Sequence, residues 1–233
     1  MSADTSSVPV VTIDGPSSSG KGTISRIVAS RVGWNLLDSG ALYRLVALGG
    51  ILKDLDPDDV AEHVAVARSM RVEFGSVGDG QEQVLFDGRD VTQKIRTEQA
   101  GAGASRVAAW PAVRTALTDR QRSFAQRPGL VADGRDMGTV IFPEARLKVF
   151  LTASPEERAQ RRHKQLIGKG SAASLAALSR EIAERDLRDS TRQVAPLKPA
   201  PDAQLLDSTG LSIEAVVERV ISLGRERNLW PKA

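Results

Sequence analysis

The sequence predicts an α/β fold in which helices cover both faces of a central parallel sheet. One observation is an N-terminal unit of apolar strand, glycine- and serine-rich loop and helical pattern over residues 9–32. Another is that short apolar runs alternate with stretches of helical periodicity along most of the chain. A third is a hairpin-like segment within residues 71–95, which predicts a small antiparallel sheet inserted among the helices.

The strands of the parallel sheet are predicted where short runs are apolar throughout, as strands buried on both faces are. These runs cover residues 9–13, 34–37, 130–132, 147–152 and, more weakly, 205–206. Apolar residues spaced three or four positions apart predict the helices. The helical patterns cover residues 24–32, 42–52, 156–165, 175–188 and 212–227.

The inserted segment differs from its surroundings because polar and apolar residues alternate in it. Residues 71–74 and 83–86 are predicted to be its two strands, and the turn-rich residues 75–80 join them. The chain contains no internal repeat, no low-complexity block and no long linker. Residues 168–173 are predicted to form no more than a short mobile joint.

The composition of the chain restricts its expected cellular location and the classes of partner that it can bind. Hydrophobic residues make up 41% and charged residues 26% of the 233 positions, which suffices for a buried core, and the lack of cysteine excludes disulfides and thiolate zinc sites. A net charge of +3 and 4% aromatic residues provide no platform for nucleic acid. Residues 1–8 lack a signal-peptide pattern, and no stretch approaches the roughly 20 apolar residues of a membrane span. We expect a cytoplasmic protein with neither a nucleic-acid nor a membrane partner.

The strongest local signal is a loop of glycines, serines and one lysine between the first strand and the first helix. Glycines let successive backbone N–H groups converge on a phosphate, and the helix N-terminus adds partial positive charge. The lysine can reach the outer phosphates of a nucleoside triphosphate. The residues of this predicted ATP-binding loop are Gly15, Pro16, Ser17, Ser18, Ser19, Gly20, Lys21, Gly22 and Thr23. A simple turn would explain the glycines, but not the lysine, strand and helix together.

One position departs from the usual phosphate-loop pattern. Gly22 follows Lys21 directly, where a serine or threonine would otherwise ligate Mg²⁺, and Thr23 comes one residue later. Thr23 remains a candidate for a phosphate or magnesium contact. Asp133 is a second candidate, because an acidic residue after a buried strand orients magnesium or its waters in phosphate-loop enzymes. From its surroundings alone, a turn-forming Asp133 is an equally good interpretation.

Three further motifs narrow the interpretation. They cover residues 36–44, 132–139 and 184–189, and they follow the Gly-Lys-Gly-Thr ending of the loop in this order. Together they resemble bacterial cytidylate kinases, a family of nucleoside monophosphate kinases, from about Pro9 to about Val220. The resemblance implies a P-loop fold, transfer of a phosphoryl group from ATP to CMP or dCMP, and Mg²⁺ as cofactor, and we expect a monomer. It also implies one domain, with a core at about 9–70 and 105–230, a CMP-binding insertion at about 71–104 and a lid at about 156–170.

The resemblance also implies roles, position by position. Contacts to cytosine fall on Ser39, Arg114 and Asp136, and contacts around the sugar fall on Ser105, Arg185 and Asp189. The CMP phosphate is held by Arg44, Arg135 and Arg192. The lid carries Arg158, Arg161 and Arg162, and the catalytic cations are Lys21, Arg135, Arg158 and Arg162.

Chemistry alone supports these arginines unequally. A guanidinium binds two phosphate oxygens at once, but a lone arginine is usually a solvated surface residue. Arg135 is favoured, because loops at the carboxyl ends of parallel strands bind ligands. Four charged residues share one helix face, and their spacing alone would favour a solvated stripe with ion pairs. They are Arg185, Arg188, Asp189 and Arg192.

Other functions explain less of the sequence. A UMP/CMP kinase is the nearest alternative, but residues 133–139 and the hairpin favour CMP. A GTP-dependent switch would carry an Asn-Lys-x-Asp motif, which the chain lacks, and the composition disfavours an RNA-binding accessory protein. Asp136 has an alternative of its own, an ion pair that only holds its loop. The transfer needs no general base, because the acceptor phosphate is mostly ionised near neutral pH, so we expect His63 and His163 at the surface.

Overall fold

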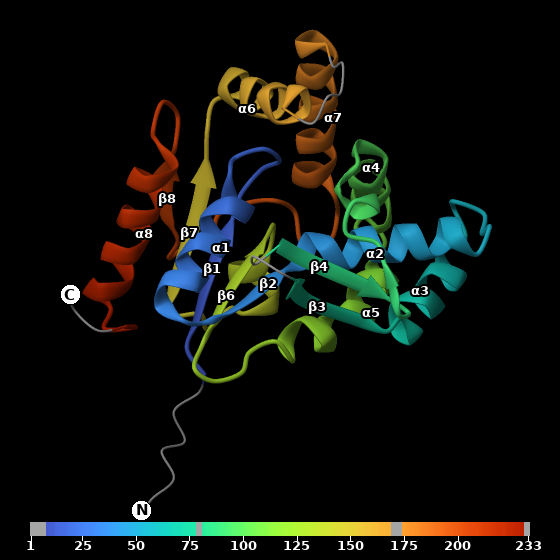
Figure 1. Ribbon diagram of the computed structural model, residues 1–233, viewed down its shortest axis with the longest axis horizontal. Helices are drawn as coiled ribbons and strands as arrows, with labels where there is room; N and C mark the ends of the chain where they lie inside the picture. The colour runs from blue at the N-terminus through green and yellow to red at the C-terminus, as the bar shows by residue number, and fades with distance from the viewer. Residues whose placement is uncertain (1–7, 78–80, 169–173, 231–233) are drawn as a thin grey trace, which may run out of the picture. The chain divides into compact units, whose positions relative to one another are not determined.

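The computed structural model describes residues 8–77, 81–168 and 174–230. The chain divides into two compact units, and Figure 1 labels most of their helices and strands. The sheet unit comprises Met1–Asp38 and Gln121–Ala233, and the hairpin unit comprises Ser39–Arg120. The predicted α/β fold is confirmed, since a five-stranded parallel sheet and a three-stranded antiparallel sheet are both present.

The sheet unit is built on five strands that all run parallel. In spatial order they are β2 (Asn35–Asp38), β6 (Leu130–Gly134), β1 (Val10–Asp14), β7 (Leu147–Thr152) and β8 (Gln204–Asp207). All five predicted strands are confirmed, each within two residues of its expected ends. Because β1 pairs with β6 on one side and β7 on the other, the loops that follow these three strands leave from the same edge of the sheet.

Two helices, α1 (Lys21–Val32) and α8 (Ile213–Glu226), cover one face of this sheet. Val11 and Ile13 of β1 are fully buried in the apolar core between the sheet and these helices. The core extends to Trp34 and Trp230, whose rings meet edge to face at 5.4 Å. Both helices match predicted patterns.

The opposite face of the sheet carries η2 (Met137–Ile141), a single π-helical turn. Thr12 points to this face, because side chains alternate along β1 between the two faces. A β-carbon at Gly138 would lie 2.8 Å from Thr12 Oγ1 and 3.1 Å from Cδ of Lys148. Glycine therefore lets η2 pack closely on the strands, a feature that the sequence pattern did not predict.

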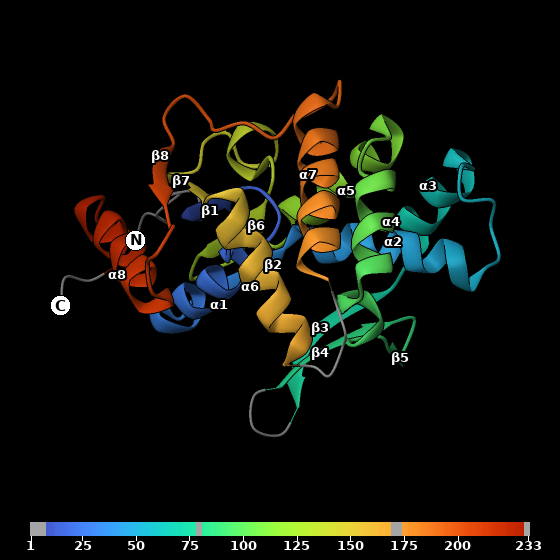
Figure 2. The same cartoon turned by 90° about the horizontal axis from the view of Figure 1, so that it is seen from above.

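The other helices of the sheet unit, α6 (Pro155–Ile167) and α7 (Leu175–Thr191), pack against each other (Figure 2). Each begins at a serine cap, Ser154 for α6 and Ser174 for α7, whose side chain accepts a backbone N–H of the first turn. Both helices were predicted. The segment 169–173, which includes most of the predicted joint and the end of the predicted lid, lies outside the described residues.

The hairpin unit contains an antiparallel sheet in the order β3-β4-β5. Its strands are β3 (Val72–Val77), β4 (Gln81–Phe86) and β5 (Arg89–Asp90). The predicted hairpin is confirmed with longer strands, and residues 78–80 of its turn lie outside the described ranges. The helical elements of the unit are α2 (Ser39–Leu52), α3 (Val60–Ser69), η1 (Lys94–Arg96), α4 (Glu98–Val107) and most of α5 (Pro111–Arg122).

The hairpin unit is wider than the insertion predicted at about 71–104. Helix α2 packs on both α3 and α4, and Gly103 approaches Ala47 so closely that a β-carbon would lie 2.9 Å from the alanine side chain. This packing groups α2 and α3 with the small sheet. Helices α3, α4 and α5 were not predicted. In α4 and α5 the reason is composition, because α4 is rich in small residues and α5 in polar ones.

The expected surface position of His63 is wrong. Its side chain is buried, and Nδ1 lies 2.7 Å from the carbonyl oxygen of Asp59. The ring meets Trp110 edge to face at 5.3 Å, and a β-carbon at Gly50 would lie 2.3 Å from Nε2. His63 is thus a packing residue on the inner side of α3. His163, on α6, is partly exposed.

None of the helices within the described ranges combines the length and the apolar character that a membrane span requires.

Candidate active site

The phosphate loop connects β1 to α1 with a backbone that needs glycine at two points. Gly15 passes so close to β7 that a β-carbon would lie 2.0 Å from the carbonyl oxygen of Leu151. Gly20, the residue before α1, has a left-handed backbone with φ +92°. The loop therefore ends at the N-terminus of a twelve-residue helix, which is a favourable place for an anion.

Lys21, the first residue of α1, folds back over this loop. Its side chain is buried, and Nζ donates a hydrogen bond to the carbonyl oxygen of Pro16 at 3.1 Å. Burial and, to a smaller extent, the nearby charge of Arg135 lower the pKa of Lys21 to about 7, against the opposing effect of Asp133. Two cations thus lie close enough to destabilise each other, and a bound phosphate would relieve this repulsion.

Arg135 follows β6 and is held by Asp189 of α7, with 2.9 Å between Nε and Oδ2. Burial alone would lower the pKa of Arg135, but the charge and hydrogen bond of Asp189 raise it above its ordinary value. In Asp189, burial favours the neutral acid, but Arg135 and Arg185 more than compensate and lower its pKa. Both groups therefore stay charged, and the pair fixes the arginine at the edge of the sheet.

Asp136 and Arg192 form a second buried contact, with 3.8 Å between Oδ1 and Nη2 and side-chain exposures of 3% and 6%. Arg192 is the C-terminal cap of α7, and its Nε donates to the carbonyl oxygen of Ala195. Within the stripe predicted on α7, Asp189 is buried and Arg185 half-buried, whereas Arg188 is exposed. The sheet unit thus brings four predicted site residues into two ion pairs, Arg135–Asp189 and Asp136–Arg192.

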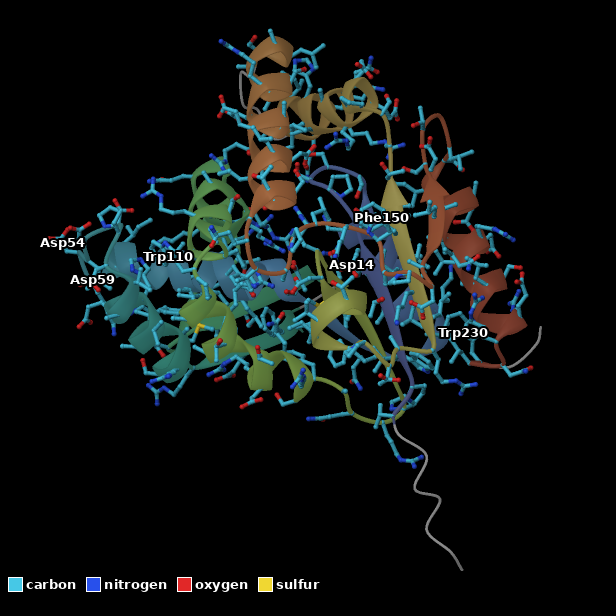
Figure 3. The ribbon with its side chains drawn as sticks, turned by 180° about the vertical axis from the view of Figure 1, so that it is seen from behind. Asp14, Asp54, Asp59, Trp110, Phe150 and Trp230 are labelled. Atoms are coloured by element: carbon cyan, nitrogen blue, oxygen red, sulfur yellow. The ribbon has the colours of Figure 1, made fainter. Side chains whose placement is uncertain are left out.

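Asp14, at the carboxyl end of β1 (Figure 3), was not singled out by sequence reasoning. Its carboxylate accepts backbone hydrogen bonds from Met137 at 2.9 Å and Gly138 at 2.8 Å, so it anchors the start of η2. Burial, with smaller effects from the charges of Asp136 and Asp133, raises the pKa of Asp14 to about 7 against the opposing effect of these two hydrogen bonds. The only sequence signal was a carboxylate directly after a buried strand.

The lid arginines differ in what they contact. Arg158 is buried and donates to the carbonyl oxygen of Ser17 at 3.2 Å. Arg161 donates to the carbonyl oxygen of Ser19 at 3.2 Å and to Ser208. Arg162 instead donates to Gln165 of its own helix at 2.6 Å. The first two therefore lie against the phosphate loop.

Asp186 is a second carboxylate that the sequence analysis did not single out. Its Oδ1 accepts two hydrogen bonds from Ser17 of the phosphate loop, one from the hydroxyl Oγ at 3.0 Å and one from the backbone N–H at 3.4 Å. Its other oxygen pairs with Nη1 of Arg158. No sequence signal links Asp186 to Ser17, because Asp186 lies 169 positions later, on helix α7.

Asp133 and Thr23, the two candidates for magnesium, are placed differently. Asp133 is buried, and a β-carbon at Gly22 would lie 3.1 Å from its Oδ2. The glycine that replaces the usual hydroxyl residue thus leaves room for a carboxylate beside the start of α1. Thr23 is exposed on the first turn of α1. A carboxylate and a hydroxyl oxygen are suitable ligands for magnesium.

The hairpin unit holds the other four predicted site residues. Ser39 and Ser105 are buried on α2 and α4, two helices that pack against each other. Arg44 of α2 is half-buried and donates to the carbonyl oxygen of Ile95 at 3.2 Å. Arg114 is buried, donates to the carbonyl oxygen of Ala108 at 3.2 Å, and lies 5.6 Å from the ring centre of Tyr43. This cation–π contact attracts the guanidinium to the face of the ring.

Comparisons of the sequence with known proteins find cytidylate kinases. The family model for cytidylate kinase matches residues 11–226. A cytidylate kinase of Stutzerimonas stutzeri (strain A1501) is 56% identical over 223 residues, which cover 95% of this chain and 97% of that protein. A cytidylate kinase of Pseudomonas aeruginosa (strain LESB58) is 58% identical over 215 residues, which cover 92% of this chain and 94% of that protein. Among solved structures, the chain is similar to a gluconokinase from Sinorhizobium meliloti 1021, with a TM-score of 0.48 and 14% identity, over 94% of each chain.

Proposed function

Because this chain belongs to the cytidylate kinase family, it transfers the γ-phosphoryl group of ATP to CMP, giving CDP and ADP, and we propose that the charged residues of the sheet unit carry out the transfer. The observation that supports this role most directly is the electrostatic interaction between two cations at the phosphate loop, the buried Lys21 and the largely buried Arg135. Such repulsion is costly without an anion, and the phosphates of the substrates supply one.

In this mechanism the protein positions the phosphates and neutralises their charge. The loop N–H groups and Lys21 hold the outer phosphates of ATP, and Arg135 and Arg192 hold the CMP phosphate. Arg158 approaches the transferred group from the lid, and Arg162 joins it when the lid closes. No proton has to be removed, since the attacking phosphate oxygen is already ionised near pH 7. The rate then depends on geometry and fixed charge rather than on a base.

For the Mg²⁺ that accompanies ATP, the residues that fit are Asp133 and Thr23. Magnesium takes oxygen ligands and keeps several waters, so a single carboxylate beside the phosphates is sufficient. Asp133 meets this requirement, because it is buried next to Gly22 and its charge acts on Lys21. When bound, the ion supplies charge neutralisation to the phosphates, and Asp133 orients it directly or through water.

Base recognition in the sheet unit falls to Asp136. A carboxylate accepts a hydrogen bond from the exocyclic amino group of cytosine, whereas it would face the lone pairs of the uracil carbonyl. The ion pair with Arg192 places a cation beside the Asp136 carboxylate, and a carboxylate offers about four lone-pair sites to hydrogen-bond donors. Asp136 therefore attracts one pyrimidine and repels the other, which yields specificity.

Six further site residues complete the proposed CMP contacts. Ser39 and Arg114 contact the base, Arg44 contacts the phosphate, and the region of the sugar is contacted by Ser105, Arg185 and Asp189. Support in the hairpin unit comes from burial and from the backbone hydrogen bonds that fix Arg44 and Arg114. The proposal also includes dCMP as a second acceptor, a monomeric enzyme and a cytoplasmic location.

A coupled assay of ADP release with CMP, dCMP, UMP and AMP tests the proposed function. We expect CMP to give the highest kcat/KM and UMP a value at least about tenfold lower, as one well-placed base contact provides. Equal use of UMP and CMP would favour the UMP/CMP kinase alternative. No ADP release with any monophosphate would exclude a kinase acting on these acceptors.

A further inference from the structure

Asp186 contacts both the phosphate loop and the lid helix. It lies within the motif at 184–189, but none of the roles proposed above uses it. We propose that Asp186 is a positioning residue, which fixes the guanidinium of Arg158 against the phosphate loop in the orientation needed for phosphoryl transfer. This inference rests on the proposed function, because it takes Arg158 as a cation that meets the transferred group.

The first support is the way in which Arg158 is held. Its Nε donates to the carbonyl oxygen of Ala153 at 3.1 Å, and its Nη1 donates to the carbonyl oxygen of Ser17 and to Asp186. Nη2 makes no hydrogen bond to any residue that the structure describes. Two of the three guanidinium nitrogens are therefore fixed by the protein, and the third is left to donate to a phosphate oxygen.

The second support is that the carboxylate is shared with the loop. One oxygen of Asp186 accepts from the hydroxyl and the backbone N–H of Ser17, which is 5% exposed, and the other pairs with Arg158. Asp186 thus couples the orientation of the guanidinium to the backbone of the loop that binds ATP. A displacement of about 1 Å in such a group can cost on the order of 10²-fold in rate.

The sign of the charge argues for positioning rather than for substrate binding. A carboxylate at a phosphate site repels the ligand unless a cation neutralises it. Asp186 is neutralised by Arg158, so its negative charge is directed at the arginine rather than at the substrate. Removing Asp186 should therefore change the rate of transfer more than the affinity for either substrate.

The lid helix has a second, independent attachment to the loop, so loss of Asp186 does not detach it. Arg161 donates to the carbonyl oxygen of Ser19, to Oγ of Ser208 at 2.9 Å and to the carbonyl oxygen of Ser208 at 2.6 Å. A purely structural Asp186 would then be largely redundant, and its replacement would leave kcat unchanged in a protein that folds.

The test compares Asp186→Ala and Asp186→Asn with Glu184→Gln, an exposed carboxylate two positions earlier on α7. We expect Asp186→Ala to lower kcat by about 10–10²-fold, while KM for CMP and the Kd of an ATP analogue change less than about threefold. Asp186→Asn, which keeps one acceptor oxygen, should recover part of the rate. Glu184→Gln should match the wild type.

A double-mutant cycle decides whether Asp186 acts through Arg158. In an Arg158→Ala background, removing Asp186 should lower kcat no further, because there is no guanidinium left to position. An equal further loss in that background would overturn the inference, and so would a wild-type kcat in a folded Asp186→Ala variant. Both results would leave the proposed function intact, as long as the wild type phosphorylates CMP. A wild type inactive with CMP would overturn the proposed function and the inference together.

Discussion

The Asp14 carboxylate accepts a hydrogen bond from the backbone N–H of Gly138 at 2.8 Å, and this contact ties the end of the central strand to the π-helical turn η2. Arg135 and Asp136 directly precede that turn, so the geometry of two proposed substrate contacts depends on a residue that makes no proposed contact itself. Asp14 is itself buried, and mainly for this reason its pKa is raised to about 7.

The first prediction concerns the pH dependence of stability at Asp14. The folded pKa of about 7 exceeds the unfolded value of 3.8, so between these values the folded state holds a proton that the unfolded state has lost. Asp14 therefore makes the free energy of unfolding fall as pH rises through this window, by at most about 1.4 kcal/mol per pH unit. Asp14→Asn removes this contribution. The difference in Tm, variant minus wild type, should increase from pH 5 to pH 7 and level off above it.

Thermal unfolding of both proteins across pH 5–8 checks this expectation. Parallel Tm curves for variant and wild type would show that Asp14 has the same pKa in both states. The test uses the change in this Tm difference with pH and not the absolute Tm of the variant. Asparagine has one side-chain oxygen where aspartate has two, so the variant also alters the hydrogen bonds to the backbone N–H groups of Met137 and Gly138.

The second prediction concerns Lys21. Its ammonium follows the charge that develops on the transferred phosphoryl group, so Lys21→Met should lower kcat by about 10²–10³-fold. Lys53→Met is a matched control, because Lys53 is exposed and outside the phosphate loop, and it should keep wild-type activity. Steady-state kinetics with saturating ATP and CMP measure the effect. Near wild-type turnover in the Lys21 variant would exclude the assigned role of the loop lysine.

The third prediction concerns Arg44 and Arg135, the proposed clamps of the CMP phosphate. Replacing either with alanine should raise KM for CMP and lower kcat/KM, whereas the Kd of an ATP analogue should change little. Arg219→Ala, on the exposed side of α8, serves as the control. Calorimetric titration of each variant with the ATP analogue makes the comparison. Equal losses for both ligands would point to misfolding or to a role on the ATP side.

The fourth prediction concerns base choice at Asp136. Asp136→Ala should lower kcat/KM for CMP far more than for UMP, because it removes the attraction to cytosine together with the repulsion of uracil. One base contact of this kind is worth roughly 1–3 kcal/mol of discrimination. Asp136→Asn should narrow the CMP-to-UMP ratio as well, since an amide can accept from cytosine or donate to uracil. Both substrates are measured on variants that unfold cooperatively. An unchanged ratio of kcat/KM for CMP to that for UMP would exclude Asp136 from base recognition and leave it a structural role in the buried ion pair with Arg192.

Local patterns predicted much of the fold, because they report properties that neighbouring residues share. The run at 147–152 matches β7 to the residue, and the glycine loop followed by Lys21 is where the spacing put it. Contacts between distant positions left no such trace. Asp14 bonds residues more than 120 positions later, and the link between Asp186 and Ser17 spans 169 positions. His63 was expected at the surface because the phosphoryl transfer needs no base, yet it is buried and packs on Gly50 and Trp110.

The approach of Asp133 to Gly22 makes the local geometry at these two positions interdependent. A side chain at position 22 would place its first carbon 3.1 Å from Oδ2 of Asp133, so the carboxylate would have to give way by a few tenths of an ångström. A hydroxyl residue introduced directly after the loop lysine would therefore add one candidate magnesium ligand and displace the other at the same time.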